Sequence, residues 1–156
     1  MKYSLLILFI LSLVACEQTE LNWNTINKKI QQEFPEVERI NINELNAKDH
    51  KSIILIDVRK KEEFMVSHIA GAINLSDPFD IAEIASESEK DVVVYCSVGY
   101  RSAAIVHELK NLGINNAINL EGSIFAWSNA GLPLVNKAGS TRDVHPYDEY
   151  WGQLLN

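Results

Sequence analysis

The residues with the clearest potential for chemistry lie in one short stretch that follows an apolar run. Residues 92–95 read as a buried strand that delivers Cys96 into a loop ending at Arg101. A helix is expected to begin directly after the loop, with Ser102 as its cap. The N–H groups of the loop and the positive end of the helix dipole both favour a thiolate over a thiol. The stretch therefore predicts an anion cradle with a reactive sulfur at its base.

The other loop residues have expected parts in binding the anion. Gly99 allows a tight turn and lets the backbone approach a bound group closely. Arg101 adds a fixed positive charge and a fork of N–H donors. We therefore expect Cys96 and Arg101 to be the catalytic residues. The residues expected to bind the substrate around them are Ser97, Val98, Gly99, Tyr100 and Ser102.

Three blocks of sequence resemble motifs of the rhodanese family of sulfurtransferases, in the family's order. The first lies within residues 53–74 and includes Asp57-Val58-Arg59 and Glu63-Phe64. The second is the cysteine loop, and the third covers residues 119–133. The resemblance extends over roughly residues 36–135. It implies an α/β rhodanese-like fold, in which a mainly parallel central sheet of five strands carries helices on both faces.

The same resemblance implies a two-step transfer of sulfur through Cys96, without a cofactor. The thiolate attacks the outer sulfur of a small anionic donor such as thiosulfate, sulfite leaves, and a persulfide forms. The terminal sulfur then passes to an acceptor, either cyanide or a thiol. Arg101 matches the family's loop arginine and would orient the donor, while loop N–H groups stabilise the anions.

Three serines depart from the family's pattern. Ser97 stands where many thiosulfate-using members have a basic residue, which weakens the assignment of thiosulfate as donor. Ser67 and Ser123 stand where glycine is usual. We expect neither of these two to affect the chemistry.

Two other functions remain open. Arsenate reductases and phosphatases of related fold hold phosphate-like anions in a cysteine-to-arginine loop, but theirs is one residue longer than the four residues between Cys96 and Arg101. No aspartate offers itself as their general acid. A non-enzymatic module that binds sulfur or protein is the second alternative. Degenerate family members often lose the cysteine, whereas this chain keeps it.

Asp57 and Arg59 match the first family motif and support two interpretations. They would either shape the floor and wall of the active-site cleft or form an internal ion pair, such as Arg59 with Glu63 four residues later. Charge pairs at this spacing are common, which favours the ion pair. His68 and Trp127 are interpreted as structural residues. No cluster of histidine, cysteine and acidic residues has the spacing of a metal site, so no metal is expected.

The amino-terminal residues read as a targeting segment. Lys2 precedes an apolar core that is short for a bilayer span, and residues 13–16 resemble a bacterial lipoprotein box. We expect residues 1–15 to be a signal peptide and Cys16 to carry lipid. The alternative is an ordinary secretory signal cut near Ala15. If Cys16 carries lipid, the protein is expected to be an extracytoplasmic lipoprotein that faces the periplasm or the cell exterior.

Composition limits the partners of the mature chain. The net charge of −7 becomes −8 without residues 1–15, since Lys2 is their only charge. Such an acidic body does not attract nucleic acid or anionic lipids, so membrane attachment would rest on acyl chains. With Cys16 lipidated, Cys96 is the one thiol left and no internal disulfide is possible. We expect a monomer.

The 141 mature residues have the length of a single domain. Residues 16–35 are interpreted as a lipid-attached tether and an amphipathic helix, and residues 36–135 as the rhodanese-like domain. In the latter, strands are expected at 39–42, 53–58, 72–75, 92–95 and 117–120, alternating with helices. Residues 136–156 form a tail in which Tyr150, Trp151 and Leu154 are expected to dock on the domain; whether the tail reaches the loop stays open.

Overall fold

The computed structural model describes residues 21–156. The predicted signal peptide, the predicted lipid attachment at Cys16 and the start of the predicted tether lie outside the described residues. None of the helices within residues 21–156 is long and apolar enough to cross a membrane.

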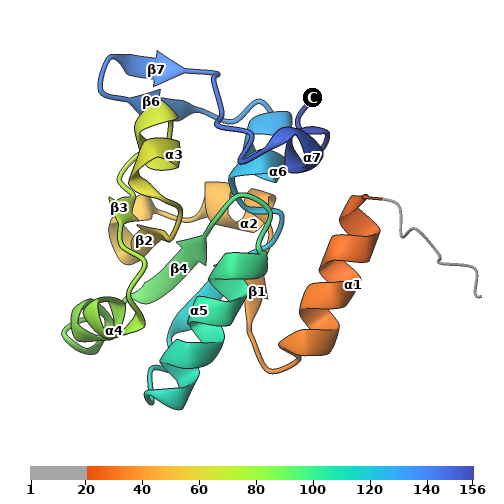
Figure 1. Ribbon diagram of the computed structural model, residues 1–156. Helices are drawn as coiled ribbons and strands as arrows, with labels where there is room; N and C mark the ends of the chain where they lie inside the picture. Colours follow the sequence, from red (N-terminus) through yellow and green to blue (C-terminus); the bar gives the residue numbers. More distant parts are fainter. Residues whose placement is uncertain (1–20) are drawn as a thin grey trace, which may run out of the picture.

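A parallel sheet of five strands forms the centre of the molecule (Figure 1). Its spatial order is β1-β5-β4-β2-β3, and every pairing is parallel, which confirms the predicted α/β fold. Strands β2 and β4 read as continuous apolar runs because both of their faces are covered. The strands are β1 (Arg39–Ile40), β2 (Ile53–Asp57), β3 (Ile73–Asn74), β4 (Asp91–Tyr95) and β5 (Ala117–Leu120).

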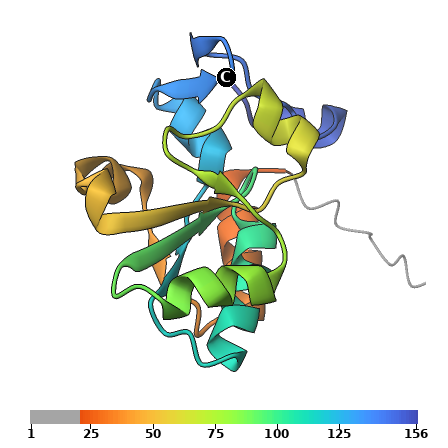
Figure 2. The ribbon, with the colours of Figure 1, turned by 90° about the vertical axis from the view of Figure 1, so that its left-hand side faces the viewer.

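Helices cover both faces of this sheet (Figures 1 and 2). Helices α1 and α4 both pack beside α5, and α2 packs beside α6. The amphipathic helix predicted before the domain is present as α1, whose Ile26 and Ile30 are buried. The helices are α1 (Trp23–Glu33), α2 (Ile42–Ala47), the 3-10 turn η1 (His50–Ser52), α3 (Lys61–Val66), α4 (Pro78–Ser86), α5 (Tyr100–Asn111), α6 (Ser123–Asn129) and α7 (Glu149–Gly152).

Two helices begin earlier than the sequence predicted. The strand expected over 39–42 stops at Ile40, because Asn41 caps α2 and forms a capping box with Glu44. Helix α5 begins at Tyr100, not after Ser102. Its cap is Gly99, whose φ of +103° is a left-handed conformation that a side chain would strain. The prediction that Ser102 caps this helix is therefore wrong.

The tail after residue 133 contains a hairpin that the sequence analysis did not predict. Strands β6 (Leu134–Asn136) and β7 (Gly139–Thr141) pair antiparallel, and Val135 bridges to His68. Further on, Leu154 is buried in the core cluster and Trp151 packs partly against it. Tyr150, which we expected to dock, is 51% exposed instead.

Candidate active site

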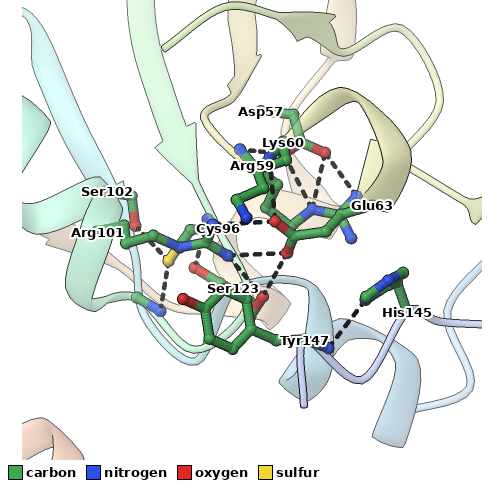
Figure 3. Close-up of polar contacts among 12 residues, drawn as sticks. Asp57, Arg59, Lys60, Glu63, Cys96, Arg101, Ser102, Ser123, His145 and Tyr147 are labelled. Atoms are coloured by element: carbon green, nitrogen blue, oxygen red, sulfur yellow. Dashed lines mark hydrogen bonds and ion pairs between the residues drawn. The ribbon is translucent and has the colours of Figure 1, made fainter. Parts of the chain in front are cut away.

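The loop between β4 and α5 places the sulfur of Cys96 beside two hydrogen-bond donors (Figure 3). The N–H of Gly99 donates to Sγ at 3.2 Å, and the Ser102 hydroxyl donates to it at 3.5 Å. Ser102 is in position to do so because it lies in the first turn of α5 and not at its cap. The cysteine side chain is buried, with 1% of its surface exposed. The two donors thus favour the anion of a sulfur whose burial alone would oppose it.

The carbonyl groups of the loop are bound on the side away from the sulfur. The first N–H groups of α6, those of Ile124 and Phe125, donate to the carbonyls of Cys96 at 3.2 Å and Ser97 at 3.1 Å. The side-chain amide of Asn119 donates to the carbonyl of Gly99 at 3.1 Å. These bonds fix the peptide planes on both sides of the Val98–Gly99 peptide, whose N–H is directed at the sulfur.

Ser123 belongs to this support, contrary to the expectation that it would not affect the chemistry. Its hydroxyl accepts a hydrogen bond from the Cys96 N–H at 3.1 Å and donates to the carbonyl of Leu120 at 3.0 Å. The preceding Gly122 has a φ of +70°, and a Cβ there would lie 2.5 Å from that of Ala126. The family's third motif therefore fixes the backbone under the reactive cysteine.

Arg101 is held in a bidentate ion pair with Glu63. Its two terminal nitrogens donate to the Glu63 carboxylate at 3.0 and 2.9 Å, and one also donates to Ser97 Oγ at 2.9 Å. The Ser97 hydroxyl in turn donates to Glu63 at 3.2 Å. Glu63 comes from α3, and its side chain is almost fully buried. Sequence analysis missed this residue as part of the site and paired it with Arg59.

Asp57 and Arg59 pair with each other, so the expected partner Glu63 is wrong although the internal ion pair is correct. Their closest atoms lie 2.7 Å apart, and both side chains are fully buried. Arg59 also donates to the carbonyl of Ser67 at 2.6 Å, which ties β2 to the end of α3. The pair supports the backbone around the site and does not itself contact the sulfur in any described hydrogen bond.

The electrostatics of the site favour a thiolate. Burial raises the pKa of Cys96, but the charge of Arg101 and hydrogen bonds from Ser102 and Gly99 outweigh it, so the pKa is lowered. Burial also acts against the charge of Glu63, yet the Arg101 contacts hold its pKa below the ordinary value. The carboxylate in turn raises the pKa of Arg101 further. Both members of the ion pair are therefore charged at neutral pH.

A pocket of about 320 Å³ opens above Cys96. Ser97, Val98, Tyr100 and Arg101 of the loop line it, together with two residues of α1 and two of the tail. Tyr147 places its ring 4.8 Å from the Arg101 guanidinium carbon, a cation–π contact. The tail therefore reaches the active-site loop, which answers the point that the sequence left open.

The remaining candidates are structural. His68 donates a hydrogen bond from Nδ1 to the carbonyl of Phe64 at 3.0 Å, and its ring stacks on the Phe64 ring. Trp127 is buried, and its indole N–H donates to the carbonyl of Pro133. Within residues 21–156, no group of histidine, cysteine and acidic side chains is placed to hold a metal ion.

Comparisons with known proteins agree with this fold. The model of the rhodanese-like domain family matches residues 42–130, and the chain belongs to that family. A sulfurtransferase of Allochromatium vinosum is 34% identical over 94 residues, 58% of this chain and 86% of that protein. An uncharacterized protein of Synechocystis is 35% identical over 85 residues, and the match spans 48% of its length and 54% of this chain.

Solved structures show the same fold. A rhodanese-related protein of Thermoplasma volcanium has a TM-score of 0.54 and 33% identity, covering 63% of this chain and 97% of its own. A thiosulfate sulfurtransferase of Pseudomonas aeruginosa has a TM-score of 0.61 and covers 85% of this chain and 26% of its own. At 21% identity, the latter likeness shows the fold alone.

Proposed function

We propose that the protein transfers sulfane sulfur through a persulfide on Cys96. The observation that carries the proposal is the buried sulfur with Gly99 N–H and the Ser102 hydroxyl directed at it and a charged arginine beside it. Membership of the rhodanese-like domain family and the likeness to a protein named a sulfurtransferase support the same reaction.

The first step loads the cysteine. The Cys96 thiolate attacks the outer sulfur of a donor such as thiosulfate, and a new S–S bond forms. The bond between the two donor sulfurs breaks, and sulfite leaves with its electron pair. The donors at the loop that stabilised the thiolate then stabilise the persulfide anion.

The second step transfers the added sulfur from Cys96 to the acceptor. A nucleophile, either cyanide or a thiolate, attacks the terminal sulfur of the persulfide. The electron pair of the broken S–S bond returns to Sγ, which becomes a thiolate again. No sulfur is lost and no external oxidant or reductant is needed.

Mass spectrometry of the intact protein tests the loading step. Treatment with thiosulfate is expected to add the mass of one sulfur atom at Cys96, and cyanide is expected to remove it as thiocyanate. Cys96→Ala abolishes both signals while the thermal unfolding transition stays near that of the wild type, because the removed thiol is small. If no adduct forms with thiosulfate, polysulfide or an organic persulfide, the protein is a binding module and not a transferase.

We further propose that the mature protein is a monomer attached to a membrane through lipid on Cys16, outside the cytoplasm. The sequence pattern of residues 13–16 supports this. Metabolic labelling with an alkynyl fatty acid is expected to mark the wild type and not Cys16→Ser. Protease treatment of intact cells and spheroplasts, followed by size measurement of the detergent-solubilised protein, tests its side of the membrane and its oligomeric state.

A further inference from the structure

The walls of the pocket above Cys96 come from segments that lie outside the family match. The match covers residues 42–130 and supplies the loop at the pocket floor. Ile26 and Lys29 of α1 form one side, and Tyr147 and Trp151 of the tail form the other. The rhodanese-like part thus provides the sulfur and the loop around it, while appended segments add further walls to the pocket.

These walls are mainly apolar. Ile26 is buried, and Tyr147 and Trp151 present aromatic surface, while Val98 of the loop adds an aliphatic side chain to the floor. Cyanide and thiosulfate are small and strongly hydrated, and neither would bury this surface. A ligand with an apolar body would, and burial of apolar surface is favourable in proportion to its area.

The charges around the loaded cysteine also disfavour a doubly charged acceptor. Arg101 is already neutralised by the Glu63 carboxylate through two hydrogen bonds. The persulfide anion on Cys96 adds one negative charge, so these three groups together are negative when the acceptor binds. The other cation of the lining, Lys29, forms an ion pair with Glu33 within α1. A neutral or singly charged ligand is therefore favoured over a doubly charged one.

We infer that the sulfur acceptor is a small organic thiol with an apolar, preferably aromatic, body. The inference rests on the proposed function, since it names the substrate of the second step. The body lies between Trp151, Tyr147 and Ile26, and the thiol sulfur reaches the persulfide at the pocket floor. The volume of about 320 Å³ is within the range of pockets that enclose small organic ligands.

The transfer balances without another reactant. The thiol sulfur attacks the terminal sulfur of the Cys96 persulfide anion and forms a new S–S bond. The S–S bond to Sγ breaks, and its electron pair regenerates the thiolate. The thiol proton passes to the terminal sulfur of the product, which leaves as an organic persulfide.

Discharge of the loaded protein by two thiols tests the inference. Benzyl mercaptan and 2-mercaptoethanol are each compared by the second-order rate at which they remove the extra sulfur mass. Each rate is divided by that thiol's rate with glutathione persulfide, which corrects for intrinsic reactivity. We expect the corrected ratio to favour benzyl mercaptan by about tenfold, as burial of part of an aromatic ring would give.

Substitutions of the aromatic residues that line the pocket test whether they cause the preference for benzyl mercaptan. Trp151→Ala and Tyr147→Ala are each expected to lower the ratio severalfold toward one. Phe79→Ala is the matched control, because Phe79 is an exposed aromatic residue on α4 that does not line the pocket. It is expected to leave the ratio unchanged. A ratio near one in the wild type, with normal loading and discharge by cyanide, overturns the inference while the proposed function stands.

A binding measurement covers the case in which no persulfide forms. Benzyl methyl sulfide has the same body but no thiol, and it is expected to slow alkylation of the Cys96 thiol by iodoacetamide in a saturable way. Trp151→Ala weakens this protection and Phe79→Ala does not. Failure of loading with intact protection would refute only the proposed transfer. Absence of protection would refute the assigned pocket.

Discussion

Two arginine–carboxylate pairs lie within this domain, and they differ in what surrounds them. Asp57 and Arg59 are both fully buried, and Arg59 also binds the carbonyl of Ser67. Arg101 keeps 33% of its side chain exposed in the pocket, while its partner Glu63 is almost fully buried. The first pair connects backbone segments, and the second faces the sulfur. The same chemical pairing thus occurs once in the closed interior and once at the edge of the pocket.

The two pairs differ in access to the pocket and not in ion-pair geometry, and we infer that this access separates a structural from a reactive role. Both pairs are bidentate, and each includes at least one residue of the first family motif. Only the second adjoins the pocket lining. If this interpretation is correct, removing one arginine should mainly lower stability and removing the other should mainly lower reactivity.

The largest effect is expected from Arg59→Met. It leaves Asp57 charged and buried without its partner, which costs about 3–5 kcal/mol of folding free energy. Urea unfolding measures the loss. Arg142→Met, at an exposed position in the tail, is the control and should change stability by less than about 0.5 kcal/mol. Equal losses in the two variants would contradict a structural role for the buried pair.

Arg101→Ala is expected to lower reactivity more than stability. The thiolate loses its fixed positive charge, so the pKa of Cys96 rises and loading by thiosulfate at neutral pH slows by at least about tenfold. The stability loss should be smaller than for Arg59→Met, since Glu63 keeps bonds from Lys60 N–H and the Ser97 hydroxyl. The loading rate of Arg101→Lys should lie between those of the wild type and Arg101→Ala, because lysine keeps the charge without the fork of N–H donors.

Glu63→Gln is expected to act in the opposite direction on the thiol. The amide removes a negative charge that opposes the thiolate, so the pKa of Cys96 falls further below its ordinary value. The rate of iodoacetamide alkylation then reaches half its maximum at a more acidic pH than in the wild type. Glu62→Gln, one residue earlier and exposed, is the control. An upward shift would mean that Glu63 acts mainly by holding Arg101 in place.

The smallest effect is expected from Ser102→Ala. The hydroxyl is 3.5 Å from Sγ and donates a weak hydrogen bond to it. Its loss raises the pKa of Cys96 by less than Arg101→Ala does, and the alkylation profile moves slightly to higher pH. A shift as large as that of Arg101→Ala would assign the main stabilisation of the thiolate to the hydroxyl and not to the guanidinium.

Local patterns explain why the sequence predicted the sheet and the cysteine loop. The apolar runs at β2 and β4 mark buried parallel strands, and the resemblance of three blocks orders them. The start of α5 was missed because Ser102 is a good capping residue by type, whereas Gly99 caps it through its left-handed backbone. The hairpin β6–β7 was missed because its strands have three residues each and little apolar alternation.

Contacts between distant segments could not be predicted from spacing. Glu63 lies four residues after Arg59, which suggested the wrong pair, while its actual partner follows 38 residues later. Tyr147 reaches Arg101 only because the tail returns over the loop, and no local signal in the sequence marks that return. Ser123 stands where the family usually has glycine and was expected not to affect the chemistry, although its hydroxyl accepts a hydrogen bond from the Cys96 N–H.

The bonds from Ile124 and Phe125 to the loop carbonyls have a consequence for biosynthesis. A ribosome adds Cys96 more than thirty residues before Asn129, the last residue of the helix that binds the loop carbonyls. Until that helix is made, the carbonyls of Cys96 and Ser97 lack these two hydrogen bonds. The backbone around the cysteine therefore reaches its final arrangement only after most of the domain has been synthesised.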